Sequence, residues 1–188
     1  MKIAVVQASS QASKNEMFYT YTKKYAKDAE VINFGCFVDE DENFTYVEIA
    51  LLIGMLINRH TVDFVVTGCS SGQGMMHACN SMPGVLCGYV PTAKDAFLFA
   101  QINNGNAVSL PLGEEYTYTG GKNLEKTIQA LFSEPFGGGY PESEAKRKIE
   151  DAEKLKEIKS KSQIDFESFL NKLDPDMVKK VKHKILTQ

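Results

Sequence analysis

The chain has 188 residues, of which 43% are hydrophobic and 24% are charged, and its formal net charge at pH 7 is -3. This composition is typical of a soluble globular protein with one sizeable core, and the charge argues against a nucleic-acid partner. The opening apolar run, Met1 to Val6, is too short for a signal peptide, and no stretch reaches the length of a membrane span. We therefore expect a cytoplasmic protein with no membrane partner.

The four cysteines show no CxxC spacing, and without a secretion signal a disulfide framework is not expected. We expect reduced thiols at Cys36, Cys69, Cys79 and Cys87. No grouping of histidine, cysteine and aspartate has the spacing of zinc ligands, so we expect no metal.

Five short apolar runs alternate with helical patterns along the first part of the chain. Strands are predicted at Lys2–Gln7, Glu30–Phe34, 64–67, Val85–Val90 and Asn106–Leu112. Helices are predicted up to about Lys27 and over Tyr46–Asn58, Gln73–Ser81, Lys94–Ile102 and Asn123–Ser133. This alternation predicts an α/β fold with a doubly wound, five-stranded parallel sheet, which binds ligands beyond the carboxyl ends of its strands.

Turn and cap signals separate these elements. An acidic loop is predicted at Gly35–Asn43, and Thr92 is placed to cap the fourth helix. The sequence Thr119-Gly120-Gly121 predicts a turn, and the run from Pro135 to Pro141 ends the fifth helix. The second helix is apolar around most of its circumference, so we expect it to be well buried.

The chain changes character at Glu142, which divides it into a main domain, 1–141, and a charged helical extension, 142–188. A long amphipathic helix is predicted over 142–161, and a second helical piece over 166–173. Asp174 and Pro175 could cap and start a third. We expect the extension to pack on the main domain or on a sister subunit.

The third strand runs into a loop of small residues, Gly68 to Gly74, and a helix follows. Cys69 therefore stands between a strand end and a helix N-terminus, where the helix dipole favours a thiolate. The glycines let a ligand approach the main chain. Neither the nucleotide-hydrolase fingerprint nor the dinucleotide fingerprint is present, so an ordinary tight turn with an inert cysteine remains the alternative.

Two further groups of residues have both an ordinary and a functional interpretation. His77, in the helix after the loop, is either an ordinary helical residue or a catalyst. The run Asn103-Asn104-Gly105-Asn106 is either a turn that ends a helix or a set of amides that hold sugar hydroxyls.

The loop from Cys69 to Met75, with Ala78, Asn80 and Pro83-Gly84-Val85 after it, resembles the ribose-5-phosphate isomerase B and galactose-6-phosphate isomerase family. Similar matches occur at Lys2-Ile3-Ala4, Val31 to Gly35, Asn103-x-x-Asn106 and Phe136 to Gly139, so the resemblance covers about the first 140 residues in order. It implies a Rossmann-like fold, aldose–ketose isomerase activity without a cofactor, and a homodimer or homotetramer with active sites shared between subunits.

The resemblance also implies roles for the loop residues. Cys69 would be the base that moves a proton between neighbouring sugar carbons through an enediolate. Ser71 stands where the family has a threonine that, with backbone amides of the loop, stabilises the oxyanion. The loop residues that would supply those amides are Ser70, Gly72, Gln73 and Gly74. His77 is the candidate for a second proton carrier.

The chain departs from the family pattern where the sugar phosphate is bound and opened. Ala8-Ser9 replaces an Asp-His pair, Ile102 replaces the ring-opening histidine, and Tyr140 replaces an arginine that is suited to phosphate. These substitutions resemble a branch that includes isomerases of unphosphorylated 4-deoxy-hexosulose uronates, whose open-chain substrates need no ring opening. The implied substrate-binding residues are Ala8, Ser9, Gln11, Ser13, Lys14, Asn103, Asn106 and Tyr140.

The expected ligand is thus a small sugar or sugar acid, with the keto-uronate as the first choice. One alternative is a sugar phosphate similar to ribose 5-phosphate or galactose 6-phosphate. The other, of a different class, is a non-catalytic sugar-binding subunit.

Overall fold

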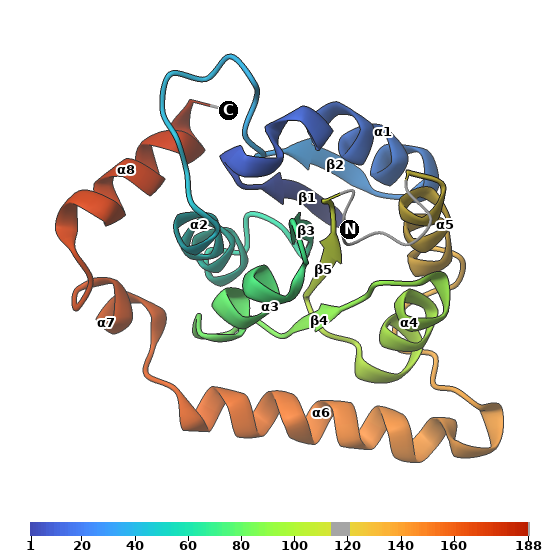
Figure 1. The fold of residues 1–188 in the computed structure, drawn as a ribbon. Helices are drawn as coiled ribbons and strands as arrows, with labels where there is room; N and C mark the ends of the chain where they lie inside the picture. The colour runs from blue at the N-terminus through green and yellow to red at the C-terminus, as the bar shows by residue number, and fades with distance from the viewer. Residues whose placement is uncertain (114–120, 188) are drawn as a thin grey trace.

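The protein is described from a computed structural model that covers residues 1–113 and 121–187, with the side chains of residues 121 and 122 left out. Its centre is a parallel sheet with the strand order β2-β1-β3-β5-β4 (Figure 1). The strands are β1 (Lys2–Gln7), β2 (Glu30–Asn33), β3 (Phe64–Cys69), β4 (Cys87–Tyr89) and β5 (Ala107–Pro111). The predicted α/β fold with a five-stranded parallel sheet is confirmed.

Helices cover both faces of this sheet. On one face lie α2 (Tyr46–Asn58) and α3 (Gln73–Asn80), and on the other lie α1 (Asn15–Tyr25), α4 (Ala93–Leu98) and α5 (Gly121–Leu131) (Figure 1). Strand side chains alternate between the faces: in β1, Ala4 packs with α2 whereas Val5 packs with α1 and α5. Such a doubly covered sheet explains why its strands read as continuous apolar runs.

Helix α2 is buried almost all round, as predicted. It begins with a capping box, in which the Thr45 side chain accepts from the Glu48 N–H while the Glu48 carboxylate accepts from the Thr45 N–H at 2.7 Å. The cap fixes where the first turn of the helix starts, and so where Tyr46 stands.

Three elements differ from the predicted ones. Strand β4 is shorter than Val85–Val90, because the Val85 N–H donates to the Met82 carbonyl and the Leu86 N–H to the Asn106 side chain, so that pairing with β5 begins at Cys87. The helix predicted over Lys94–Ile102 passes into a π-turn, η2 (Phe99–Asn103), and the first helix is preceded by a 3-10 turn, η1 (Ser9–Lys14). Thr92 caps α4 as predicted. Of the turn predicted at Thr119-Gly120-Gly121, residues 119 and 120 lie outside the described residues.

The C-terminal part forms η4 (Glu142–Glu144), α6 (Ala145–Ser162), α7 (Phe166–Leu170) and α8 (Pro175–Leu186). Helix α6 runs along one side of the main body, and α7 and α8 lead the chain back to the loop that precedes α2 (Figure 1). Asp174 and Pro175 start α8 as predicted. Val178 and Val181 of α8 belong to the core beside α2, so the end of the chain packs on the main domain.

Helix α6 is amphipathic as predicted, yet its apolar residues are unequally covered. Ala152 is buried, whereas Ile149, Leu155 and Ile158 are exposed. Within residues 1–113 and 121–187, no helix combines the length and the apolar character that crossing a membrane requires.

Candidate functional site

The loop between β3 and α3 lies at the carboxyl edge of the sheet. Gly72 is the N-cap of α3 at φ 78°, and a Cβ there would stand 2.9 Å from backbone atoms of Leu110 and Pro111. Ser109 Oγ also donates a 2.6 Å hydrogen bond to the Gly72 carbonyl. The position therefore requires glycine, and β5 holds the loop in place.

Cys69 stands at the mouth of this loop. It is partly exposed, whereas Cys36, Cys79 and Cys87 are buried. Burial raises the pKa of the Cys36 thiol, and contact with the Cys79 thiol together with burial raises the pKa of Cys87. The buried thiols at Cys36 and Cys87 are thus kept neutral, and Cys69 is the described cysteine that a dissolved substrate can reach.

The N-terminus of α3 offers donors beside this thiol. The first N–H groups of any helix lack partners within it, and the positive end of the helix dipole lies there. The Cys69 Sγ is 3.9 Å from the place that a Cβ of Gly74 would occupy. Ser71 is partly exposed, and its Oγ accepts a long bond of 3.4 Å from the Gln73 N–H. This arrangement suits a developing negative charge next to a base.

The segment after β1 closes on the same edge. Gln11 Nε2 donates a 2.9 Å hydrogen bond to Ser70 Oγ, although the two residues are 59 positions apart. Ser9 forms two bonds with Phe44: its N–H donates to the Phe44 carbonyl at 3.0 Å, and its Oγ accepts from the Phe44 N–H at 2.8 Å. The structure therefore brings the predicted residue Gln11 together with the glycine loop, and it joins Ser9 to the segment that precedes α2.

The remaining predicted residues of this segment differ in exposure. Ala8 is 1% exposed and belongs to the core beside α2, so its methyl group faces away from solvent. Ser13 is exposed, and Lys14 is partly buried at the end of η1. His77 is exposed on α3, while Met75 and Cys79 of that helix face the core.

Three predicted residues lie elsewhere on the chain. Asn106 precedes β5 at the amino end of the sheet, and its side chain bonds to the Leu86 N–H and the Gly84 carbonyl. Because Cys69 pairs with Pro111, five positions further along β5, the strand rise places Asn106 about 16 Å from the glycine loop. The two bonds to Leu86 and Gly84 hold Asn106 in the turn, and the sugar-binding role of the asparagine run stays a prediction.

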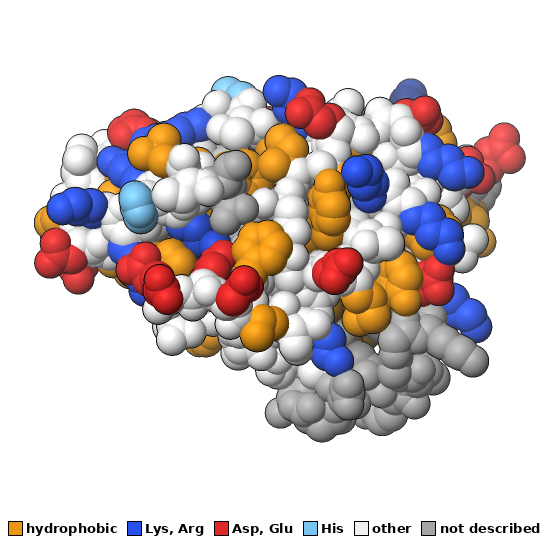
Figure 2. Space-filling view, turned by 90° about the horizontal axis from the view of Figure 1, so that it is seen from above, with side chains coloured by type: hydrophobic (Ala, Val, Ile, Leu, Met, Phe, Trp, Pro, Cys, Tyr) orange, Lys and Arg blue, Asp and Glu red, His pale blue; other side chains and the backbone are white. Residues whose placement is uncertain are grey.

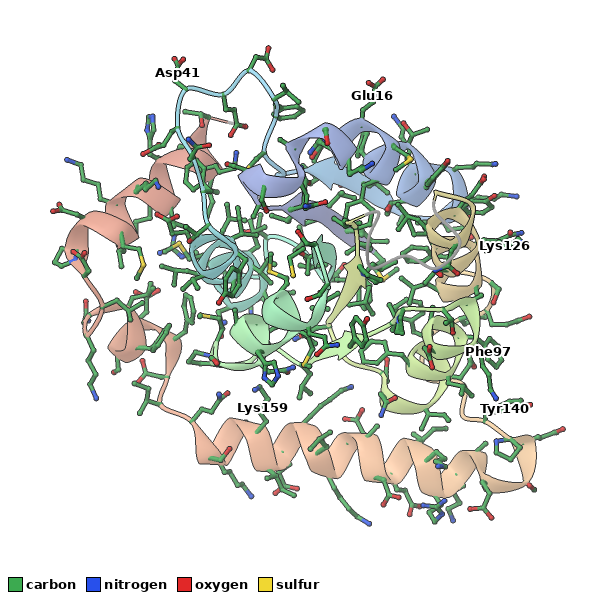
Figure 3. All side chains as sticks on the ribbon, in the orientation of Figure 1. Glu16, Asp41, Phe97, Lys126, Tyr140 and Lys159 are labelled. Atoms are coloured by element: carbon green, nitrogen blue, oxygen red, sulfur yellow. The ribbon has the colours of Figure 1, made fainter. Side chains whose placement is uncertain are left out.

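Asn103 and Tyr140 flank the neighbouring edge of the molecule. Asn103 is exposed and lines a cavity of about 400 Å³ along β4, together with Tyr89 and Leu155. The Tyr140 ring packs edge-on against Phe97 of α4, with 5.3 Å between centroids (Figure 3). Neither residue lies in the cluster formed by Cys69, Ser70 and Gln11.

Two tyrosines beside the loop were missed by sequence reasoning. The Tyr46 ring is 3.6 Å from the Cβ position of Gly74, and the Tyr89 ring would meet a Cβ at Gly72 at 2.7 Å. Tyr46 directly follows the helix cap at Thr45. The cap was a usable sequence signal for where Tyr46 stands in α2, but it does not indicate that the Tyr46 ring lies beside Gly74.

Both arginines of the chain are ion-paired with carboxylates. Arg147 binds Glu144 at 2.8 Å and Asp151 at 2.9 Å, and Arg59 lies 3.8 Å from Glu167. Neither partner set includes a residue of the glycine loop or of the segment after β1. No group of three or more potential metal ligands was found among the described residues.

The chain is similar to known proteins over most of its length. The family model described as Ribose/Galactose Isomerase matches residues 3–151. A solved 4-deoxy-L-threo-5-hexosulose-uronate ketol-isomerase, complexed with a tartrate, is 42% identical with a TM-score of 0.90 over 96% of this chain and 86% of that chain. A ribose-5-phosphate isomerase from Vibrio parahaemolyticus is 37% identical with a TM-score of 0.89 over the same shares.

More distant similarity concerns the fold alone. The type B ribose 5-phosphate isomerase from Trypanosoma cruzi is 24% identical with a TM-score of 0.70, over 86% of this chain and 99% of that chain. A search among curated proteins finds no match.

Proposed function

The chain belongs to the ribose/galactose isomerase family, and from this premise we propose that its substrate is an unphosphorylated deoxy-keto-uronate. The protein is an aldose–ketose isomerase, as the resemblance of the Cys69–Met75 loop implied. The similarity to a hexosulose-uronate ketol-isomerase and to a ribose-5-phosphate isomerase is nearly equal, so overall likeness does not select the substrate. The chemistry of the residues must do so.

The proposal of an unphosphorylated substrate rests on the ion pairing of both arginines. Phosphate recognition in proteins relies on arginine forks or on lysine. Here Arg147 forms surface ion pairs with Glu144 and Asp151, and Arg59 lies beside Glu167. Tyr140 and Glu142 stand where the family pattern places an arginine and further basic residues, and a carboxylate there repels a phosphate. Gln11, Ser13 and Lys14 are our candidates for binding the substrate's carboxylate and hydroxyls.

In the proposed reaction the Cys69 thiolate takes the proton from the hydroxyl-bearing carbon next to the aldehyde. The electron pair moves to the aldehyde oxygen, and the resulting enediolate is stabilised by Ser71 and the amides of the loop. The Cys69 thiol then returns the proton to the former aldehyde carbon, and the hydroxyl proton passes to the former aldehyde oxygen, which leaves a ketone. His77 is our candidate for that second transfer.

The substrate assay is a direct comparison in D₂O. Purified protein is incubated separately with 4-deoxy-L-threo-5-hexosulose uronate, ribose 5-phosphate and galactose 6-phosphate, and NMR follows both conversion and deuterium uptake at carbon. We expect turnover of the uronate with a kcat/KM at least tenfold above either phosphate. A higher kcat/KM for ribose 5-phosphate would replace the proposal with the sugar-phosphate alternative, which the 37% identical isomerase supports.

We further propose a homodimer whose active sites combine residues of two subunits. Cys69 and Asn106 are about 16 Å apart along the strands of one chain, so one chain alone cannot place both on a small sugar. A second copy that presents its Asn103 and Tyr140 to the glycine loop would complete the site. The supporting observation is that Asn103 and Tyr140 are both exposed.

Subunit mixing tests the shared site. Cys69→Ala and Asn103→Ala are each expected to be inactive, whereas unfolding and refolding them together creates mixed dimers with one intact site. Random association then restores about a quarter of the wild-type activity. An inactive mixture of correctly folded dimers, or a fully active monomer in sedimentation, would contradict the shared site.

A further inference from the structure

A buried lysine of the last helix pairs with the acidic loop that precedes α2. Lys184 Nζ lies 2.9 and 3.0 Å from the two carboxylate oxygens of Glu40, and the Lys184 side chain is 3% exposed. An ammonium group taken this far from water requires a paired anion. Glu40 supplies it from a position 144 residues earlier in the chain.

A second lysine, one helical turn away, reinforces this contact. Lys180 Nζ donates to the Asn43 carbonyl at 2.6 Å and to Glu48 Oε1 at 2.7 Å. Both ammonium groups also lie over the ring of Phe44, at 4.6 Å and 4.9 Å from its centroid. Such cation–π contacts are strongest where water is excluded, and Phe44 is 4% exposed. Helix α8 therefore fixes the loop from Glu40 to Phe44 at several points.

The residues held by α8 are joined to the proposed active site. The backbone of Phe44 forms both hydrogen bonds with Ser9, and Gln11, two residues further on, bonds to Ser70. Glu48 completes the cap at Thr45, which places the Tyr46 ring against Gly74. Two short paths thus connect the lysines of α8 with the glycine loop.

The loop that precedes α2 exposes acidic and apolar side chains. Asp41 stands at its tip (Figure 3), and on the face seen from above hydrophobic side chains are interspersed with both acidic and basic ones (Figure 2). Phe37 and Val38 of the same loop are 40% and 76% exposed. The loop thus keeps apolar side chains in water, and the contacts with α8 counteract its release.

We propose that Lys180 and Lys184 are positioning residues that align Ser9 and Tyr46 with the catalytic loop. This inference rests on the proposed function of the site. A buried ion pair is commonly no more stabilising than a well-packed apolar pair, so stability alone does not account for it. The Lys184–Glu40 ion pair instead holds the loop in one defined conformation, and helix α8 thereby helps to position the residues of the catalytic loop.

The main variant is Lys184→Met, with Lys182→Met as the matched control, because Lys182 is an exposed lysine of the same helix. We expect Lys184→Met to lower kcat for the hexosulose uronate about tenfold or more, with KM changed less than twofold, since small misplacements of catalytic groups act on the transition state. A purely structural role would lower the melting temperature and leave kcat per folded molecule unchanged, which would overturn the proposal.

A milder variant guards against loss of folding. Glu40→Gln removes the negative charge of a residue that is 22% exposed, and Lys184→Arg keeps the positive charge. We expect Glu40→Gln to lower kcat as much as Lys184→Met does. The Lys184→Met/Glu40→Gln double variant should have a kcat no lower than either single variant. Lys184→Arg should retain most of the wild-type activity. Additive losses in the double variant would show that the two residues act separately and would contradict the proposal.

Two measurements need no turnover and separate this inference from the proposed function. Amide hydrogen exchange at Ser9 and Phe44 should be at least tenfold faster in Lys184→Met than in Lys182→Met. Alkylation of Cys69 by iodoacetamide should also change rate in Lys184→Met alone. If the wild type is inactive on the uronate, the proposed function fails while these readouts still test the positioning. Unchanged exchange and unchanged alkylation would overturn it.

Discussion

Gln11 and Ser70 are joined by a 2.9 Å hydrogen bond between the Gln11 amide nitrogen and the Ser70 hydroxyl oxygen. This bond ties the segment after β1 to the glycine loop after β3, at the edge where the two parallel strands end side by side. A site built from two adjacent strand ends depends on such cross-links, because the local bonds within each loop, such as the one from the Gln11 N–H to the Ala8 carbonyl, do not fix one loop relative to the other.

Gln11→Ala and Ser70→Ala should each weaken catalysis, and their double variant should be less impaired than the sum. A neutral hydrogen bond contributes about 1 kcal/mol, so the coupling energy in kcat/KM should be of that size. The check is a double-mutant cycle on the uronate substrate, with the exposed Gln129→Ala as control. A coupling near zero would mean that the bond does not support the site.

Cys69→Ala should abolish deuterium exchange at the substrate's carbon while the fold is retained. A positioned proton-transfer group contributes roughly a hundred- to ten-thousand-fold in rate, and Cys69 is partly exposed, so its loss leaves no core cavity. Exchange by NMR and the far-UV circular dichroism spectrum together check this. Cys87→Ala, a buried control, should lose stability but keep exchange; exchange at the wild-type rate in Cys69→Ala would refute the assignment of the base.

Gly72→Ala and Gly74→Ala should have opposite effects on stability. At Gly72 a Cβ meets backbone atoms at 2.9 Å and φ is 78°, so about 1–3 kcal/mol or more of stability is lost. At Gly74 the nearest atom is 3.6 Å away and the residue is helical, so alanine should be neutral or stabilising by up to roughly 1 kcal/mol.

The activities of the two glycine variants complete this comparison. The new methyl group at Gly74 stands 3.9 Å from Cys69 Sγ, so Gly74→Ala should lose activity without losing stability. Urea unfolding and initial rates measure the two properties separately. Equal losses of stability in both variants would be inconsistent with the geometry of the loop.

The protein should lose part of its stability in acid through Glu48. Burial raises the pKa of this carboxyl, but hydrogen bonds from Lys180 and Thr45 outweigh it, and the pKa is held below the ordinary value of 4.5. A lowered folded-state pKa stabilises the protein above the unfolded value, and this contribution is lost as pH falls through the folded value. The affected window therefore begins near pH 4.5 and extends downward.

The effect of Glu48 is isolated by comparing Glu48→Gln with the exposed Glu16→Gln. The urea unfolding midpoint of each variant and of the wild type is measured between about pH 3 and pH 6. Wild type and Glu16→Gln should lose stability together as the pH falls, and the curve of Glu48→Gln should be flatter. Parallel curves for all three proteins would argue against a role of Glu48.

The sheet and the glycine loop were predictable because their signals are local. Apolar runs of strand length and a cluster of glycines after a strand are visible within one short segment, although the contacts of Gly72 with Leu110 and Pro111 are not. The role of Asn106 was less accessible, since its bonds to Leu86 and Gly84 depend on where β4 arrives. Likewise, the helical repeat places Lys184 on the face of Val178 and Val181, but it does not indicate that the Glu40 carboxylate would be there to pair with a buried lysine.

The C-terminal extension is a second case in which a local sequence pattern predicts a helix but not its tertiary contacts. Its helical repeat predicted α6 and the start of α8, but the pattern does not indicate that Leu155 would line a cavity or that Ile158 would stay 62% exposed. Such outcomes depend on the tertiary path of the helix. The roles that the sequence resemblance implies for Cys69 and Asn103 stay predictions.

The pairing of Glu40 with Lys184 has a consequence for the order of events during synthesis. The two residues are 144 positions apart, so at about 5–20 residues per second the acidic loop waits roughly 7–30 s on the ribosome before its partner is made. Strand and helix contacts of shorter span can form in that interval. If α8 positions the loop as proposed, the segment beside Ser9 reaches its final shape only after α8 has been translated, whereas contacts of shorter span form earlier.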